Sequence, residues 1–174
     1  MIEKNQIICG DCIETMRGLP DGCIDLILTD PPYGTTACKW DTIIPLGPMW
    51  EQLKRLIKPN GAIVMTASQP FTTTLISSNM KMFKYELIWQ KTHPKGHLNA
   101  KKQPMRSHEN ICVFYDKPPT YNPQKTKGHN RKVARTQYSK PADGNSVYGA
   151  EVRNTSYDST ERYPLSVLVI SNAD

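Results

Sequence analysis

The amino-acid sequence predicts an α/β fold: a Rossmann-like sheet of parallel and mixed strands with helices on both faces, incomplete, joined to a basic region rich in loops. Three observations lead to this prediction. Short apolar runs of strand length, such as residues 25–29 and 62–66, alternate with segments of helical periodicity. The 174 residues suffice for one domain with a core, and 38% of them are hydrophobic. The net charge of +6 is concentrated in the second half of the chain.

The first elements expected are a strand, a helix and a second strand, a unit that is typical of a parallel sheet. Residues 6–9 form an apolar run of strand length. Asp11 precedes a helix over residues 12–17, and Glu14 follows it in a capping-box pattern. After a turn, residues 25–29 form the second strand.

The next elements are predicted from apolar periodicity and turn residues. Residues 45–57 have the spacing of a helix. The Pro-Asn-Gly of residues 59–61 indicates a stop and a turn before a buried strand over 62–66. A helix over about 68–79 follows, with Pro70 at its first helical position. Three further strands are expected at residues 83–91, with one aromatic face, at 109–115 and at 162–171.

The sequence Asp30-Pro31-Pro32-Tyr33 ends the strand over 25–29. Because proline lacks an N–H and fixes φ, the strand cannot continue past Asp30. In open α/β sheets, ligands bind at this carboxyl end of the strands. The carboxylate can accept hydrogen bonds from an amino group, and Tyr33 offers a face on which a planar base can stack, worth roughly 1–3 kcal/mol. The alternative is an ordinary Pro-rich turn with a capping aspartate.

Positive charge is unevenly placed along the chain. Residues 1–90 contain 8 Lys and Arg against 9 Asp and Glu, whereas residues 91–140 contain 12 against 2. This imbalance indicates that the second half meets a polyanion, although a solvated basic loop would have the same composition. We therefore divide the chain into an α/β core portion, a basic region interrupted by a core strand near 109–115, and a return strand. These parts span residues 1–91, 92–160 and 161–174.

The cysteines, histidines and hydropathy exclude several classes of protein. Five cysteines, an odd number, are expected to be reduced thiols in the cytoplasm. Cys9 and Cys12 form a C-x-x-C without a second pair, and the four histidines lack ligand spacing, so we expect no metal site. No apolar run reaches the roughly 20 residues of a membrane span, and the N-terminus lacks the core of a signal peptide.

Several segments together resemble one known family. They are Ile8-Cys9-Gly10-Asp11-Cys12, Leu19-Pro20-Asp21, Asp25 to Tyr33, Leu56-Ile57-Lys58-Pro59-Asn60-Gly61, Ser68-Gln69-Pro70-Phe71, Ile88-Trp89-Gln90-Lys91 and Arg106-Ser107-His108-Glu109. In this order they are similar to the β-class amino-methyltransferases that modify DNA, over at least residues 6–124. The resemblance implies a bacterial or phage enzyme of the restriction–modification type.

The resemblance also implies a reaction and a set of roles. Members of the family transfer a methyl group from S-adenosylmethionine, without a metal, to an amino nitrogen of a base flipped out of double-stranded DNA. Asp30 would accept one amino hydrogen and the carbonyl of Pro31 the other, with Pro32 stiffening the motif and Tyr33 stacking on the base. An aspartate at position 30 favours adenine N6 as the target, with cytosine N4 as the alternative.

Further site residues follow from the same resemblance. Asp11, Cys12 and Asp30 would contact the cofactor. A loop over residues 34–44 would close over the base, and Trp89 and Lys91 would line its pocket. The residues expected to contact DNA or the target base are Lys39, Trp40, Trp89, Lys91, Lys101, Lys102 and Arg106.

The chain departs from the family pattern in one respect. The family's glycine-rich cofactor motif, F-x-G-x-G-T, comes last in the β class, and no G-x-G occurs in this sequence. Three interpretations are open: a C-terminally truncated enzyme, one half of a split enzyme whose missing C-terminal half a partner supplies, or a DNA-binding remnant without activity. A homodimer is the other partner considered. In each case we expect exposed sheet edges, which favour aggregation.

Overall fold

A computed structural model of the chain describes residues 5–137 and 154–171. Its contacts group the chain into two compact units. The first unit contains the residues up to Tyr121 and those from Ser166 onward. The second unit spans Asn122–Leu165. Residues 92–121 belong with the sheet of the first unit, whereas the division expected from charge began at residue 92.

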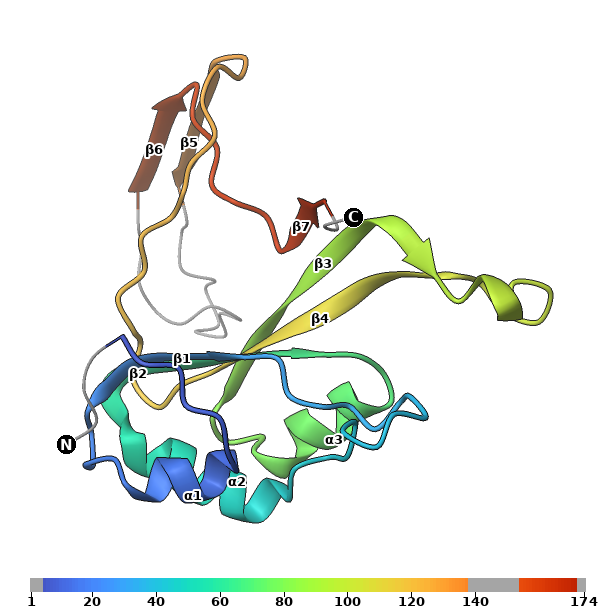
Figure 1. The fold of residues 1–174 in the computed structure, drawn as a ribbon. Coiled ribbons are helices and arrows are strands. Elements are labelled where there is room, and N and C mark those ends of the chain that lie inside the picture. Colours follow the sequence, from blue (N-terminus) through green and yellow to red (C-terminus); the bar gives the residue numbers. More distant parts are fainter. Residues whose placement is uncertain (1–4, 138–153, 172–174) are drawn as a thin grey trace, which may run out of the picture. The chain divides into compact units, whose positions relative to one another are not determined.

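The first unit is built on a five-stranded sheet with the strand order β1-β2-β4-β3-β7 (Figure 1). Its strands are β1 (Ile24–Thr29), β2 (Ile57–Ala67), β3 (Phe83–Lys95), β4 (Arg106–Phe114) and β7 (Val167–Ile170). β1 and β2 are parallel, as are β3 and β7, whereas β4 is antiparallel to both of its neighbours. The predicted mixed sheet of the Rossmann type is therefore confirmed.

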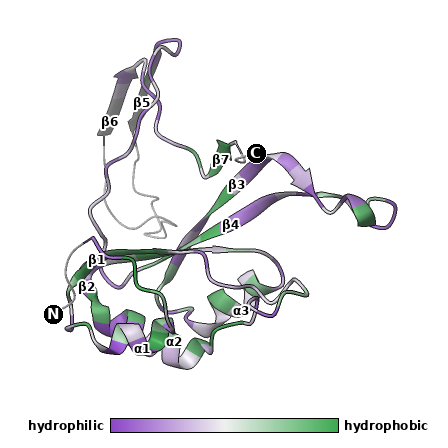
Figure 2. Ribbon diagram, in the orientation of Figure 1, coloured by the Kyte–Doolittle hydropathy of each residue, from purple (hydrophilic) through white to green (hydrophobic). Residues whose placement is uncertain are grey.

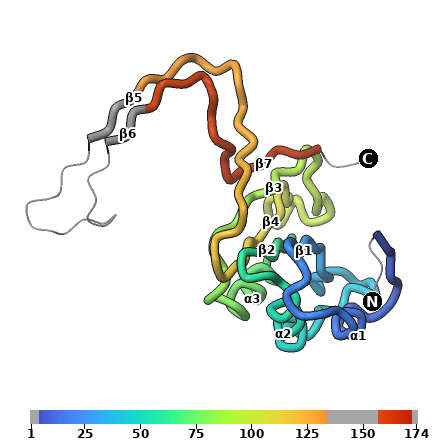
Figure 3. Tube along the Cα trace, turned by 90° about the vertical axis from the view of Figure 1, so that its left-hand side faces the viewer, coloured from blue at the N-terminus to red at the C-terminus, as the bar shows by residue number. Residues whose placement is uncertain are grey.

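The helices cover one face of this sheet. They are α1 (Cys12–Arg17), α2 (Leu46–Leu56) and α3 (Phe71–Ser78), with a single 3-10 turn, η1 (His97–Asn99). In Figures 1 and 3 the three helices lie on the same side of β1 and β2. The expectation of helices on both faces is wrong for the described residues, where Leu26 and Leu28 of β1 are 57% and 69% exposed. The apolar residues of a strand predict that a face of the sheet is apolar. They do not show that a helix of the same chain covers this face.

The hydrophobic core lies between the sheet and the helices. Alternate residues of β2, namely Ile63, Met65 and Ala67, are fully buried beneath Trp50 and Phe71. α2 presents buried side chains at helical spacing, as its sequence predicted. No helix in the described part of the chain has the length and hydrophobicity needed to cross a membrane.

The predicted start of the chain is confirmed in one part and wrong in another. The Asp11 side chain accepts a hydrogen bond from the Glu14 amide at 3.0 Å and so caps α1 as expected. Residues 6–9 form no strand, and Ile7 is fully exposed. A short apolar run becomes a strand only beside a partner edge. The parallel unit of this fold is instead β1, α2 and β2.

Residues 59–61 do not form the expected stop and turn. They lie inside β2, which begins at Ile57, directly after the last residue of α2. The extra residues form a bulge, since Ile24 pairs with Ile57 but Leu26 pairs with Ala62. A Cβ on Gly61 would lie 2.8 Å from the Asp25 carbonyl oxygen, so the tight approach of the two strands requires glycine here. The Pro-Asn-Gly therefore interrupts the pairing of β2 with β1, which resumes at Ala62, without ending the strand.

The helix expected over 68–79 begins later than predicted. α3 starts at Phe71, and Pro70 is its N-cap instead of its first helical residue. The strands expected at 83–91 and 109–115 are confirmed as parts of β3 and β4. In β3 the expected aromatic face is interrupted, because Tyr85 is 43% exposed whereas Trp89 is partly covered.

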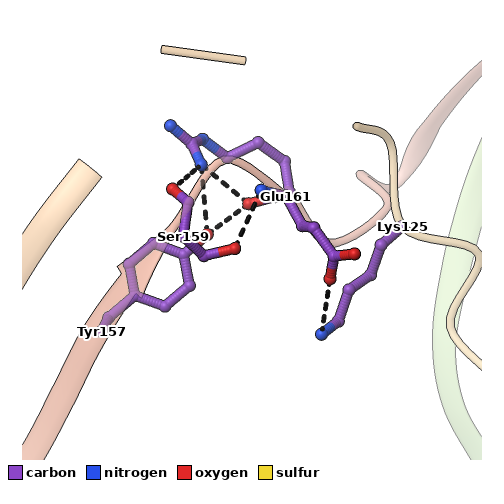
Figure 4. A network of polar contacts seen from close by, with 5 residues as sticks. Lys125, Tyr157, Ser159 and Glu161 are labelled. Atoms are coloured by element: carbon purple, nitrogen blue, oxygen red, sulfur yellow. Dashed lines mark hydrogen bonds and ion pairs between the residues drawn. The ribbon is translucent and has the colours of Figure 1, made fainter. Parts of the chain in front are cut away.

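The second unit contains an antiparallel pair that the sequence did not predict, β5 (Lys132–Gln137) and β6 (Asn154–Ser159). Both strands are too polar to show a period of two. Figure 4 shows a network of polar contacts at the end of β6 and in the residues that follow it. Arg162 donates to the Ser159 and Glu161 carbonyl oxygens at 3.0 and 2.7 Å, and Lys125 pairs with the Glu161 carboxylate at 3.3 Å. Internal pairing therefore uses part of the unit's positive charge.

Candidate active site at one edge of the sheet

Strand directions bring the predicted site residues to one edge of the sheet. β1, β2 and β3 run in the same direction, because β2 and β3 are both antiparallel to β4. Their carboxyl ends therefore lie at one edge, next to the amino end of β4. The polar side chains that gather there are Asp30, Tyr33, Thr66, Trp89, Lys91, Arg106 and Glu109.

The carboxylate of Asp30 is held asymmetrically. The Tyr33 hydroxyl donates a hydrogen bond to Asp30 Oδ1 at 2.6 Å, and the Thr66 hydroxyl donates to the same oxygen. Among the described residues, none donates to Oδ2, and the Asp30 side chain is exposed. Two donors thus fix the orientation of the carboxylate while its second oxygen can accept a hydrogen bond from a ligand.

Tyr33 is oriented by contacts on its ring and its hydroxyl. The ring stacks on Phe71 at the start of α3, with 5.5 Å between centroids and 21° between planes. Burial, together with the hydrogen bond to Asp30, raises the pKa of the Tyr33 hydroxyl above its ordinary value. The hydroxyl therefore remains protonated and donates to Asp30 throughout the neutral range.

The loop that follows Tyr33 is organised by Asp41. The Asp41 carboxylate accepts hydrogen bonds from the amides of Gly34, Thr35 and Thr36 at 2.8, 2.9 and 2.7 Å. These bonds, that of Gly34 foremost, lower the pKa of Asp41 to about 2. Gly34 has φ +67°, a left-handed conformation that favours glycine. The structure thus closes a tight loop directly after the Asp-Pro-Pro-Tyr sequence.

Lys39 and Trp40 lie on this loop and face solvent. Trp40 is 74% exposed, and Lys39 is exposed as well. The amide of Asp41 donates to the Cys38 carbonyl oxygen at 3.0 Å, which closes a turn around the two residues. Both side chains are therefore exposed on a hydrogen-bonded turn.

Trp89 and Lys91 are tied to their neighbours. Lys91 forms an ion pair with Glu109 across β3 and β4, and the two side chains are only 8% and 19% exposed. The Lys91 ammonium lies 4.8 Å from the centroid of the Trp89 ring. The Trp89 indole nitrogen donates to the Ile170 carbonyl oxygen at 3.3 Å, which joins β7 to the site edge. Lys91 is thus a buried partner of Glu109 in this structure.

The remaining predicted residues divide into three groups. Arg106 donates to Ser68 Oγ at 2.6 Å and to the Gln69 carbonyl oxygen at 3.3 Å, so its guanidinium joins β4 to the end of β2. Lys101 and Lys102 are exposed, beyond the site edge. Asp11 is occupied in capping α1, and Cys12 is exposed in the first turn of that helix.

Three residues of this edge were missed by the sequence analysis: Thr66, Asp41 and Glu109. Thr66 and Asp30 are 36 positions apart in sequence and carry no shared local signal. Asp41 is part of a Lys-Trp-Asp triplet, in which only the first two residues were expected to act. Glu109 follows Arg106 and His108 in a polar run that gave no reason to single it out. Within the described residues, no group of three His, Cys, Asp or Glu side chains could hold a metal ion.

Comparisons with known proteins give one consistent result. A family model described as DNA methylase matches residues 24–165. The type II methyltransferase M.BglII of Bacillus subtilis is 28% identical over 140 residues, which cover 67% of this chain and 36% of that protein. M.HpaI of Haemophilus parainfluenzae, also a type II methyltransferase, is 25% identical over 126 residues, 65% of this chain and 39% of that protein. The chain thus spans less than two fifths of these relatives' length.

One solved structure is similar over nearly the whole chain. The cytosine-N4-specific PvuII DNA methyltransferase superposes with a TM-score of 0.54 and 14% identity, covering 95% of this chain and 56% of that one. At this level of identity the likeness shows the fold alone.

Proposed function

Since this chain belongs to the N6/N4 DNA methylase family, whose model matches residues 24–165, we propose that it holds a DNA base by its exocyclic amino group for methylation at adenine N6. The observation that carries the proposal is the asymmetric hydrogen bonding of Asp30. Oδ1 accepts from Tyr33 and Thr66, so Oδ2 can accept from the amino group.

The chemistry assigned to these residues is the orientation of a nitrogen lone pair. Asp30 Oδ2 accepts one amino hydrogen and the carbonyl oxygen of Pro31 accepts the other. When both hydrogens are held by these acceptors, the lone pair of the nitrogen points away from them and toward the methyl group of the donor. Tyr33 stacks on the base, and Pro32 keeps the motif rigid. These residues bind and orient the base.

S-adenosylmethionine, the proposed methyl donor, supplies a methyl group made electrophilic by its sulfonium. The exposed Asp30 carboxylate is negative and so suits this cation. Leu28, two residues before Asp30, is 69% exposed and offers an apolar surface to the uncharged parts of the donor. Asp30 is therefore the first residue that we assign to the donor. Asp11 and Cys12 at the start of α1 are proposed as further contacts.

Duplex DNA is the proposed macromolecular partner, with the target base flipped out of the stack. Lys101 and Lys102 are exposed and suited to phosphate contacts, while Lys39 and Trp40 lie on the loop next to Tyr33. The exposed side chains of Leu26 and Leu28 support a second copy of the chain, or another polypeptide, as a cover for the open face of β1. We place the protein in the cytoplasm, where its five free thiols would remain reduced.

The proposal is tested by incubating the purified chain with tritiated S-adenosylmethionine and DNA and separating the labelled nucleosides. We expect label in N6-methyladenine and its loss in Asp30→Ala. Asp25→Asn is the matched control, because Asp25 lies at the opposite end of β1 in an exposed pair with Lys58.

Calorimetric titrations with S-adenosylmethionine and with DNA accompany the assay. Label in N4-methylcytosine would change the target from adenine to cytosine. A chain that does not bind DNA at low salt would contradict the proposal. DNA binding that survives Asp30→Ala without any methyl transfer would favour the DNA-binding remnant.

A further inference from the structure

A finger, defined here as residues 92–107, projects from the candidate active site edge. The β3–β4 ladder shifts register between Gln90 and Lys95, and it resumes where Lys95 pairs with Arg106. The finger begins directly after Lys91, whose ion pair with Glu109 fixes its base. In Figure 1 the finger continues β3 and β4 well beyond the rest of the sheet. It is therefore an ordered extension of two sheet strands.

The tip of the finger is a hydrogen-bonded turn. Gly96 has φ +93° and precedes η1 (His97–Asn99). The amide of Asn99 donates to the Gly96 carbonyl oxygen at 3.0 Å. The amide of Lys102 donates to the Asn99 carbonyl oxygen at 2.8 Å. These bonds close the turn and define its backbone, which carries one strongly apolar side chain.

That side chain is Leu98, which is 87% exposed. In Figure 2 a short green segment lies near the end of the finger, and the loop beyond it is purple. Burial of this side chain against another molecule would contribute about 2 kcal/mol. Single exposed apolar side chains are common on protein surfaces, so the case for a partner rests on the charge around Leu98 as well.

The charge of the finger identifies the chemistry of that partner. Residues 92–107 contain four Lys and Arg and no Asp or Glu. The guanidinium of Arg106 is bound to Ser68 and Gln69, whereas Lys101 and Lys102 are exposed beside the tip. An apolar tip between lysines suits a duplex, whose stacked bases are apolar and whose phosphates are anionic.

The finger leaves the sheet at the edge that holds Asp30. β1 and β3 run in the same direction, so Asp30 and the start of the finger both lie at the strands' carboxyl ends. A base that reaches Asp30 from a duplex leaves an empty space in the stack. Such a space is stabilised when an apolar side chain enters it.

We infer that Leu98 is an apolar wedge that enters the duplex and fills the space left by the flipped base, with Lys101 and Lys102 on the flanking phosphates. The inference rests on the proposed function, because it needs a duplex at the Asp30 edge. It goes beyond that function by assigning the flipped state a stabilising residue outside the base pocket.

The test compares the affinity of the chain for two duplexes of the same sequence, one intact and one with a central abasic site. The abasic duplex offers the space without the cost of flipping. We expect the wild-type chain to prefer it by about tenfold, and Leu98→Ala to lose that preference, since the burial of one leucine side chain is removed.

Three further variants make the result specific. Leu165→Ala is the matched control, because Leu165 is 78% exposed in the other unit, and it should keep the preference. Lys101→Ala with Lys102→Ala should weaken binding to both duplexes equally and reduce the salt slope by about 2. Trp40→Ala tests another exposed apolar side chain near the site.

Each outcome separates this inference from the proposed function. Loss of the preference in Leu98→Ala alone supports the wedge. If Leu98→Ala keeps the preference, or if Trp40→Ala alone loses it, Leu98 is not the wedge. DNA binding without any preference for the abasic duplex also overturns the wedge while leaving the proposed function standing. A wild-type chain that does not bind either duplex overturns both.

Discussion

The carboxylate of Asp41 accepts a hydrogen bond from the amide of Gly34 at 2.8 Å, and this bond closes the loop behind the Asp-Pro-Pro-Tyr sequence. The same carboxylate also binds the next two amides, those of Thr35 and Thr36. Asp41 therefore acts as an anion in a nest of backbone donors, like a carboxylate at a helix start. Its position decides where the exposed Trp40 is presented.

The loop is expected to depend on the charge of Asp41. Its pKa is lowered from 3.8 to about 2, so its carboxylate stabilises the fold above about pH 4, and this contribution is lost as the pH falls toward 2. The amide proton shifts of Gly34, Thr35 and Thr36 should titrate together with a midpoint near 2 in NMR spectra. Asp41→Asn should abolish this titration and Asp25→Asn should leave it. A midpoint at the ordinary value would contradict the nest.

Thr66 is expected to position Asp30 for catalysis. Thr66→Val keeps the shape of the side chain but removes the donor to Oδ1, a hydrogen bond to a charged group of about 1.5–3 kcal/mol. We expect kcat for methyl transfer to fall by about tenfold or more, with an unchanged KM for DNA. Thr66→Ser should restore activity. A Thr66→Val chain with wild-type kcat, or one that changes KM alone, would show that Thr66 has no positioning role.

The ion pair between Lys91 and Glu109 is expected to stabilise the sheet edge. Lys91→Met leaves a buried carboxylate without its partner and should lower the free energy of unfolding by about 3 kcal/mol in urea. Lys91→Met with Glu109→Leu should recover most of this loss. The control is Lys58→Met, whose exposed pair with Asp25 should cost less than about 1 kcal/mol. Equal effects of the two lysine variants would contradict a special role for the buried pair.

Gly61 is expected to be required by the β1–β2 bulge. In Gly61→Ala the new Cβ meets the Asp25 carbonyl oxygen at 2.8 Å, and this overlap should lower the free energy of unfolding by about 1–3 kcal/mol. The matched control is Gly47→Ala. Gly47 lies in α2, and a Cβ added to it would meet no atom within 4 Å. That variant should be neutral or stabilising by up to about 1 kcal/mol. The bulge as described is wrong if both variants behave alike in thermal and urea unfolding.

Cys112 is expected to resist thiol reagents. Burial, with a smaller effect of Glu86, raises its pKa to about 11, whereas the other four cysteines are exposed. Near pH 8, Ellman's reagent should titrate four thiols in the folded protein and the fifth only after unfolding. Cys112→Ala should give four in both states. Because the pKa is raised from 9.0, the folded state should also lose stability as the pH rises from about 9 toward 11.

Local sequence signals predicted the elements whose causes are local. The cap at Asp11 forms through a hydrogen bond to an amide three residues away, so its pattern can be read in the sequence. The end of β1 at Asp30 follows from two prolines without an N–H. Two other local signals did not give the expected element. Residues 6–9 form no strand, and the Pro-Asn-Gly of 59–61 lies inside β2, where it interrupts the pairing with β1 without ending the strand.

The sequence by itself therefore determined the α/β class, the strand that ends at Asp30 and the residue types of the candidate active site. Tertiary structure decided which Asp30 oxygen is held, since Thr66 comes from another strand, and it turned Lys91 inward to Glu109. It also decided that Leu98 stands exposed at the tip of a finger above the same edge. The physical reason is that hydrogen bonding and burial depend on neighbours in space, and strand pairing brings together residues that no local pattern connects.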